Sequence, residues 1–204
     1  PHLNEISDLP VLAADGGVRN ALALGMVPQA VIGDMDSLGD AVGLPTNIQR
    51  IHLSGQDDTD FEKCMRLIEA PLIIGVGFLD GRFDHALAVL NVLARLPRER
   101  RVLLLGAYDT LLRVNGDFRL DLDSGVRLSI WPLWRQAFVR SSGLKWPLDE
   151  IDMAAGARTG TSNTVTVGPV SIKAGPGDGY CLIAPLDAFA ALHSAALDVN
   201  PLNQ

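Results

Sequence analysis

Short apolar runs separated by polar turns set the pattern of the first half of the chain. These runs predict strands over residues 10–14, 30–32, 48–53, 72–76 and 102–105. Between them, apolar residues recur at helical spacing, which predicts helices over residues 18–24, 60–70 and 86–94. Because strands and helices alternate in this order, we expect an α/β domain with a mostly parallel sheet.

The pattern changes near residue 115. Strand-like runs separated by turns with glycine, proline or serine follow, at residues 126–131, 165–167, 170–173 and 180–184. Short runs of this kind without intervening helices are typical of an antiparallel β domain. We therefore predict an α/β domain over residues 1–115 and an all-β domain over residues 116–204.

Two carboxylates lie one residue apart directly after the predicted strand 30–32. In an extended chain, Asp34 and Asp36 would point the same way, with Met35 turned away. Two such carboxylates at the carboxyl end of a strand can hold a hard divalent cation such as Mg²⁺. The alternative is an ordinary polar turn, since aspartate, serine and glycine are common loop residues.

Other predicted strand ends in the first half also carry acidic or glycine-rich turns. With the turn at residues 33–36, there are four such turns, the others being residues 15–17, 57–60 and 81–85. In Asp15-Gly16-Gly17, the glycines let backbone N–H groups approach a ligand. In one parallel sheet, all four turns would meet along the edge where ligands bind. The combination favours a phosphoryl or pyrophosphoryl transferase that uses Mg²⁺.

Two basic residues near these turns have open roles. Arg82 is either a bidentate phosphate contact or a surface arginine on a turn. Lys63 lies three residues after Asp60 on the same helix face, so it either reaches a phosphate or pairs with Asp60.

Net charge, apolar run length and cysteine content argue against several classes of protein. A net charge of −7 argues against a broad nucleic-acid surface, which requires a basic face. No apolar run approaches the ~20 residues that a membrane helix needs, and no secretory signal is visible. Cys64 and Cys181 are far apart, and we expect buried free thiols, which suits a reducing cytoplasm.

Several familiar motifs are absent from the sequence. It contains no Gly-x-x-x-x-Gly-Lys-[Ser/Thr], which excludes a P-loop enzyme. Gly75-Val76-Gly77 has no third glycine in register, which disfavours a dinucleotide enzyme. There is also no cysteine–histidine pattern for zinc.

Together, the motifs resemble those of the thiamine pyrophosphokinase family. In the first half, the resemblance rests on residues 13–17, 25–37, 56–64 and 81–85. In the second half, it rests on Ser-Gly-Leu-Lys-Trp-Pro-Leu at residues 142–148 and Thr-Ser-Asn-Thr at residues 161–164. The matches run in order from about residue 11 to residue 185.

The resemblance implies a catalytic α/β domain, a β-sandwich domain and a homodimer with active sites between subunits. It implies transfer of pyrophosphate from ATP to the thiamine hydroxyl, with thiamine diphosphate and AMP as products. Mg²⁺ would bind Asp34, Asp36 and Asp60, and the catalytic residues would be Asp36, Asp60 and Arg82. The ATP pocket would contain Asp15, Gly16, Gln56, Asp57, Lys63, Arg82 and Asp84, and thiamine would contact Trp146, Ser162 and Asn163.

Alternatives stay open for the second half and for the acceptor. A tryptophan such as Trp146 offers an aromatic face to a cationic or electron-poor ring, yet in a β domain it is often a core residue. Ser162-Asn163 alone would be interpreted as a turn. A related enzyme acting on a hydroxymethyl pterin, or a nucleotide-binding sensor without catalysis, are the rival functions.

Overall fold

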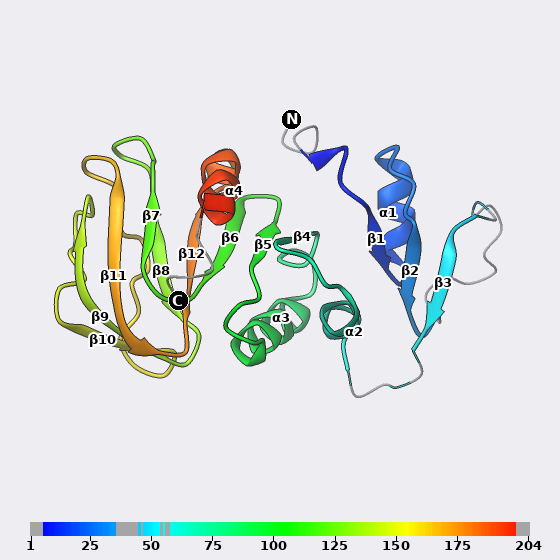
Figure 1. Cartoon of the computed structure of the whole chain (residues 1–204), viewed down its shortest axis with the longest axis horizontal. Coiled ribbons are helices and arrows are strands. Elements are labelled where there is room, and N and C mark those ends of the chain that lie inside the picture. Colours follow the sequence, from blue (N-terminus) through cyan, green and yellow to red (C-terminus); the bar gives the residue numbers. More distant parts are fainter. Residues whose placement is uncertain (1–5, 36–44, 46, 54, 56–57, 199–204) are drawn as a thin grey trace. The chain divides into compact units, whose positions relative to one another are not determined.

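A three-stranded parallel sheet forms in the first part of the chain. The computed structural model describes residues 6–35, 45, 47–53, 55 and 58–198. In it, β1 (Leu12–Ala14), β2 (Ala30–Gly33) and β3 (Gln49–His52) pair in the order β1-β2-β3. Helices α1 (Gly17–Ala23) and α2 (Asp60–Leu67) pack against β1 and β2 (Figure 1).

These elements belong to the first of two compact units, Pro1–Glu69. Its core contains the buried side chains of Ala13, Val18, Val31 and Ile48. The central strand β2 is buried along its whole length, as expected for an unbroken apolar strand with neighbours on both sides. The carboxyl ends of β1 and β2 are therefore held by a well-packed core.

The second unit, Ala70–Gln204, contains two larger sheets. Their strand orders are β4-β5-β6-β12-β8 and β10-β9-β11-β7. β4 and β5 pair in parallel, and the other neighbouring pairs in these two sheets are antiparallel. The strands are β4 (Ile73–Val76), β5 (Val102–Leu105), β6 (Asp109–Val114), β7 (Phe118–Leu120), β8 (Ser129–Pro132), β9 (Arg135–Ser142), β10 (Ile151–Ala154), β11 (Val170–Gly177) and β12 (Tyr180–Pro185).

Two helices complete the second unit. α3 (Phe83–Arg95) connects β4 to β5, and α4 (Phe189–Asp198) packs against β5, β6 and β7 after a short 3-10 turn (Figure 1). Between the two sheets, the rings of Phe138 on β9 and Tyr180 on β12 meet edge to face at 5.1 Å. The predicted order, parallel strands first and antiparallel strands afterwards, is confirmed. Within the residues that the structure describes, no helix has the length and apolar character needed to cross a membrane.

Several predicted element boundaries are wrong. The helix predicted over 60–70 ends at Leu67, because Ile68 has an extended backbone. The helix predicted over 86–94 begins at Phe83, so the predicted turn over 81–85 contributes its first residues. The run over 165–167 forms only an isolated bridge, between Val165 and Leu144.

The parallel strands are divided between two sheets. β1, β2 and β3 form the sheet of the first unit, whereas β4 and β5 share a sheet with antiparallel strands of the second. A common edge for all four acidic turns therefore stays a prediction, as does the domain boundary at residue 115.

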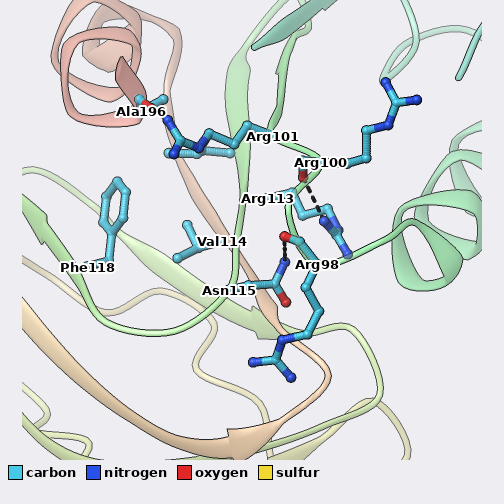
Figure 2. Close-up of a pocket in the computed structure, with 9 residues that line it drawn as sticks. Arg98, Arg100, Arg101, Arg113, Val114, Asn115, Phe118 and Ala196 are labelled. Atoms are coloured by element: carbon cyan, nitrogen blue, oxygen red, sulfur yellow. Dashed lines mark hydrogen bonds between the residues drawn. The ribbon is translucent and has the colours of Figure 1, made fainter. Parts of the chain in front are cut away.

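A buried arginine organises the chain after α3. Arg113 on β6 is 3% exposed. Its guanidinium donates hydrogen bonds to the carbonyl oxygens of Leu93, Leu96, Pro97 and Arg100, at 2.8, 2.7, 3.0 and 2.7 Å. Figure 2 shows the bond to Arg100. Carbonyls at a helix C-terminus lack helical donors, and the planar guanidinium supplies them. Burial lowers the pKa of Arg113, and its partners in these bonds are neutral.

Neighbouring arginines also bind carbonyl oxygens of the chain. Arg98 donates to Gly177 O at 2.9 Å, and Arg101 donates to Ala196 O in the last turn of α4 at 3.0 Å. The buried Asn115 donates to Arg98 O at 2.9 Å. Figure 2 shows the guanidinium groups pointing in different directions, so they do not converge on one anion. This basic cluster therefore serves the fold.

Candidate active site

The carboxyl ends of β1 and β2 approach each other closely. Asp15, the first residue after β1, is 3% exposed, and its N–H donates to Ile32 O at 2.8 Å. A Cβ at Gly33, the last residue of β2, would lie 2.8 Å from the Cβ of Asp15. Only glycine fits there, because any side chain at residue 33 would collide with Asp15.

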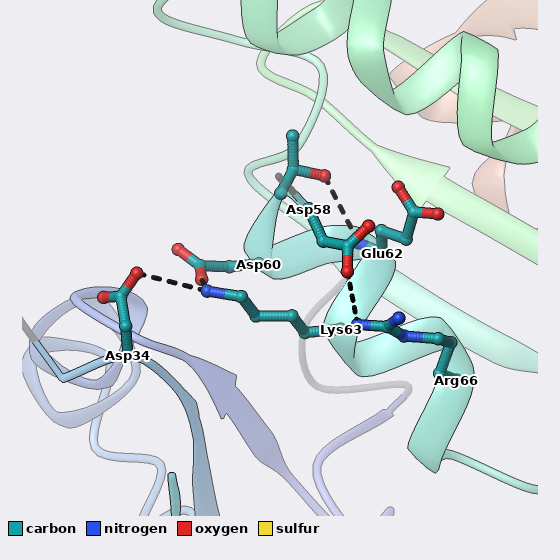
Figure 3. A network of polar contacts seen from close by, with 7 residues as sticks. Asp34, Asp58, Asp60, Glu62, Lys63 and Arg66 are labelled. Atoms are coloured by element: carbon teal, nitrogen blue, oxygen red, sulfur yellow. Dashed lines mark hydrogen bonds and ion pairs between the residues drawn. The ribbon is translucent and has the colours of Figure 1, made fainter. Parts of the chain in front are cut away.

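Two of the predicted metal ligands converge on one cation. Asp34 follows β2, and Asp60 is the first residue of α2. Lys63 Nζ lies 3.1 Å from Asp34 Oδ2 and 3.2 Å from Asp60 Oδ1 (Figure 3). Of the two roles left open for Lys63, the pair with Asp60 is present, and Asp34, distant in sequence, joins it. A phosphate contact by Lys63 stays a prediction. The first unit thus brings two carboxylates to one positive charge.

Lys63 is buried at this junction, with its side chain 2% exposed. Burial lowers the pKa of Lys63, but the hydrogen bonds that its ammonium group donates to Asp34 and Asp60, together with their negative charges, outweigh burial, so the pKa lies above its ordinary value. The ammonium group is therefore held charged, and the carboxylates keep partial access to water, with exposed fractions of 27% and 37%.

The N-terminus of α2 fixes Asp60 and Lys63. Thr59 is the N-cap, and its hydroxyl accepts a hydrogen bond from Glu62 N at 3.3 Å. Asp58 pairs with Arg66 at 2.7 Å, which joins the start of the helix to its last turn (Figure 3). Carboxylates at a helix N-terminus are also favoured by the helix dipole. The position of Asp60 thus follows from ordinary helix capping.

The donor set fits a hard cation as far as it is described. Carboxylate oxygens are the ligands that Mg²⁺ prefers, and Asp34 and Asp60 bring two carboxylates towards one positive charge. The predicted third ligand, Asp36, lies outside the described residues, as do Gln56 and Asp57. Among the residues that are described, no group of three or more histidine, cysteine, aspartate or glutamate side chains is placed to hold a metal ion. The three-ligand site therefore stays a prediction.

In the second unit, Arg82 and Asp84 pair with each other. The Arg82 guanidinium is bidentate on the Asp84 carboxylate, with Nε–Oδ1 at 3.1 Å and Nη2–Oδ2 at 2.5 Å. This hydrogen bonding lowers the pKa of Asp84. Arg82 is the N-cap residue of α3, and both side chains are exposed. The fork geometry is the one that also suits a phosphate group.

The predicted thiamine contacts lie in loops of the second unit. Trp146 is 53% exposed, so it is not a core residue, and Lys145 Nζ lies 4.7 Å from its ring centroid. Ser162 is exposed, has φ +61°, and donates its N–H to Ser129 Oγ at 3.0 Å. Asn163 is buried, and its amide hydrogen-bonds the backbone of Trp146. A ligand contact by Ser162 or Asn163 stays a prediction.

Two contacts could not have been read from the sequence. Asp34 and Lys63 are 29 residues apart, and Asn163 and Trp146 are 17 apart. The three-residue spacing of Asp60 and Lys63 indicated only that these two residues could pair, and nothing in the sequence indicated that Asp34 would join them. For the second, no local pattern separates an asparagine that holds a loop from one that lies in a turn.

Two family models match the chain. One, described as "Thiamin pyrophosphokinase, catalytic domain", covers residues 3–105, half of the chain. The other, described as "Thiamin pyrophosphokinase, vitamin B1 binding domain", covers residues 117–176. Their order along the chain is the order of the motifs.

Individual proteins and structures agree. The chain is 29% identical to thiamin pyrophosphokinase 1 of Caenorhabditis elegans over 79% of this chain and 74% of the relative. It is 32% identical to thiamine pyrophosphokinase 1 of Arabidopsis thaliana over 72% of this chain and 61% of the relative.

Solved structures share the fold. Thiamine pyrophosphokinase from Bacillus subtilis superposes with a TM-score of 0.78 at 18% identity, over 92% of this chain and 93% of that one. The yeast enzyme gives 0.72 at 16% identity, over 98% and 84%. With a catalytic-domain match over half of its length, the chain belongs to the thiamin pyrophosphokinase family.

Proposed function

We propose that this chain transfers a pyrophosphate group from ATP to the hydroxyl of thiamine, giving thiamine diphosphate and AMP. Family membership supports the reaction, and the convergence of Asp34 and Asp60 on one cation is the structural observation that carries it. The chain spans less than two thirds of the Arabidopsis relative. Because the match does not span the whole relative, the relative's activity is a proposal for this chain.

We propose that Asp34, Asp36 and Asp60 hold Mg²⁺. When bound, the ion neutralises negative charge on the phosphates during transfer. The carboxylates of Asp34 and Asp60 already share one cation, which supports their role as ligands. Lys63 would remain a positive charge beside them for a phosphate oxygen. In this arrangement, positioning and charge neutralisation supply most of the rate enhancement.

The remaining ATP contacts are assigned by motif. The turn at Asp15 and Gly16 would approach the nucleotide through its backbone, and Gln56 and Asp57 would line the same pocket. Arg82 would exchange its Asp84 partner for a phosphate, because the same planar fork matches both anions.

Thiamine would bind against Trp146, with Ser162 and Asn163 near it. Trp146 supports this proposal because its ring is exposed and therefore available for stacking. We also propose that the two sheets of the second unit form a β-sandwich, which the Phe138–Tyr180 contact between them supports. A homodimer with shared sites and a cytoplasmic location remain expectations from the family resemblance.

The reaction proceeds by attack of the thiamine hydroxyl oxygen on the β-phosphorus of ATP. The new oxygen–phosphorus bond forms as the bond from the β-phosphorus to the oxygen bridging to the α-phosphorus breaks. That electron pair leaves with AMP, and the hydroxyl proton passes to a carboxylate of the site.

The test is an incubation of the purified chain with ATP, MgCl₂ and thiamine, followed by mass-resolved chromatography. AMP and thiamine diphosphate should appear together and only with Mg²⁺. A parallel reaction contains a hydroxymethyl pterin instead of thiamine. AMP formed only with the pterin would show that the acceptor is a pterin and not thiamine. ATP binding without AMP in either reaction would contradict catalysis.

A further inference from the structure

Trp146 is exposed, yet the loop that carries it is firmly anchored. On either side of it, Leu144 and Leu148 are buried in the second unit. Lys145 N donates to Thr164 O at 2.8 Å, continuing the bridge between Leu144 and Val165. The large aromatic ring therefore projects from a segment whose neighbours are fixed.

Asn163 fixes the backbone of Trp146 itself. Its Nδ2 donates to Trp146 O at 2.7 Å, and its Oδ1 accepts from Trp146 N at 3.1 Å and from Thr164 N at 2.8 Å. Asn163 is 3% exposed, so water competes little for these bonds. A carboxamide has the same donor and acceptor as a peptide group. Asn163 therefore extends the pairing of the two segments by one further residue.

The residue after Trp146 adds a second restraint. Pro147 disfavours helical backbone angles in the residue that precedes it, so Trp146 is biased towards extended conformations. With its N–H and C=O both bound to Asn163, Trp146 keeps freedom mainly in its side-chain torsions. An exposed aromatic ring on a fixed backbone is a preformed stacking surface, which lowers the entropy lost on binding a flat ligand.

We propose that Asn163 is a positioning residue that holds Trp146 as a preformed stacking surface for the acceptor substrate. This inference rests on the proposed function for the identity of that substrate, thiamine. It assigns Asn163 to the backbone of Trp146, so its effect on the acceptor passes through the tryptophan ring.

Steady-state kinetics of Asn163→Ala test the proposal. The KM for thiamine should rise about tenfold, whereas kcat and the KM for ATP should stay within about twofold, because ground-state stacking is lost and the phosphate chemistry is untouched. Asn163→Asp keeps an acceptor for Trp146 N but loses the donor to Trp146 O, and its KM for thiamine should lie between those of the other two proteins.

Fluorescence provides a readout without substrate. Subtracting the emission of Trp146→Phe isolates the signal of Trp146 from those of the other two tryptophans. The anisotropy of Trp146 should fall in Asn163→Ala. This result separates the two ideas: a wild-type chain that makes no thiamine diphosphate contradicts the proposed function, whereas a lowered anisotropy still supports Asn163 as the residue that holds Trp146.

The matched control is Asn115→Ala. Asn115 is also a buried asparagine of the second unit, and its amide holds a different carbonyl, that of Arg98. It should leave the anisotropy of Trp146 and the KM for thiamine at their wild-type values. Equal changes in both variants, or wild-type anisotropy and KM in Asn163→Ala, would overturn the proposal.

Discussion

Two buried cations in this chain have opposite surroundings. Lys63 in the first unit faces two carboxylates, and its pKa is raised. Arg113 in the second unit faces four carbonyl oxygens, and its pKa is lowered. Both side chains are almost inaccessible to water. Burial alone therefore does not distinguish a residue of the proposed site from a residue that only stabilises the fold.

The partners make that distinction. The carboxylates around Lys63 keep partial exposure and lie beyond strand β2 and at the start of helix α2, where a second cation or a phosphate can reach them. The carbonyls around Arg113 belong to the end of α3 and the following turn, and the guanidinium completes their hydrogen bonding. The carboxylates beside Lys63 are open to a second cation, because they are partly exposed and charged. The carbonyls beside Arg113 are neutral and already have their donor, so Arg113 is expected to keep them.

The largest effect is expected from removing a charge beside Lys63. Asp60→Asn should lower kcat by about a thousandfold while the circular dichroism spectrum stays native, because a neutral amide is a poor Mg²⁺ ligand and the loss falls on the transition state. The matched control is Asp117→Asn, which removes an exposed carboxylate that pairs with Lys173. Loss of folding in Asp60→Asn, or equal activity loss in the control, would contradict a role in catalysis.

The next effect concerns Arg113. Arg113→Met should lower the free energy of unfolding by about 3 kcal/mol in urea titrations, because several carbonyls lose their donors in a buried site. Mg²⁺ should not restore this stability. Arg135→Met, which breaks an exposed pair with Asp152, is the control and should unfold near the wild-type midpoint. A wild-type midpoint for Arg113→Met would refute the structural role.

Lys63→Met sharpens the comparison through Mg²⁺. Without the ammonium group, Asp34 and Asp60 lose the positive charge that they share, and Tm should fall by about 3 °C in metal-free buffer. MgCl₂ should then raise Tm more in the variant than in the wild type, because the added cation replaces the missing one. Equal shifts in the two proteins would show that Lys63 and Mg²⁺ do not share these carboxylates.

The smallest effect concerns the cysteines, one beside each cation. Cys64 follows Lys63 in α2, and Cys181 pairs with Arg113 across β12 and β6. Burial raises the pKa of each thiol to about 12, which outweighs the lowering by the neighbouring cation. At pH 8, about one thiol in ten thousand is ionised. Ellman's reagent should therefore react slowly with the folded chain and fully in denaturant; rapid reaction of the folded chain would contradict the comparison.

The sequence predicts most of the first unit because its signals are local. Its unbroken apolar run at residues 30–32 becomes β2, and the thiol of Cys64 is free and buried as expected. In the second unit, equally local signals place β5 and the buried free thiol of Cys181. The turn at Asp34 could be placed because it directly follows its strand. Its partner in space, Lys63, could not, because a contact across 29 residues depends on how α2 packs on the sheet.

The second unit was less predictable for a physical reason. β9 was missed, because the polar Gln136 occupies an inward position that alternation reserves for an apolar residue. There it is satisfied by backbone, donating to Gly175 O and accepting from Gly179 N. β6, β7, β10 and α4 were also not predicted. Such elements depend on tertiary partners that no local window contains.

The contact between Gly33 and Asp15 limits which substitutions the chain accepts at residue 33. A library of substitutions at residue 33 should return almost only glycine, because every other residue begins with a Cβ that would displace Asp15. Relief would require Asp15 to move, so a side chain at residue 33 would be tolerated only after a change at or around residue 15. The single hydrogen atom at residue 33 thus lets the last residue of β2 lie against the first residue after β1, and one strand end sets which residue the other can carry.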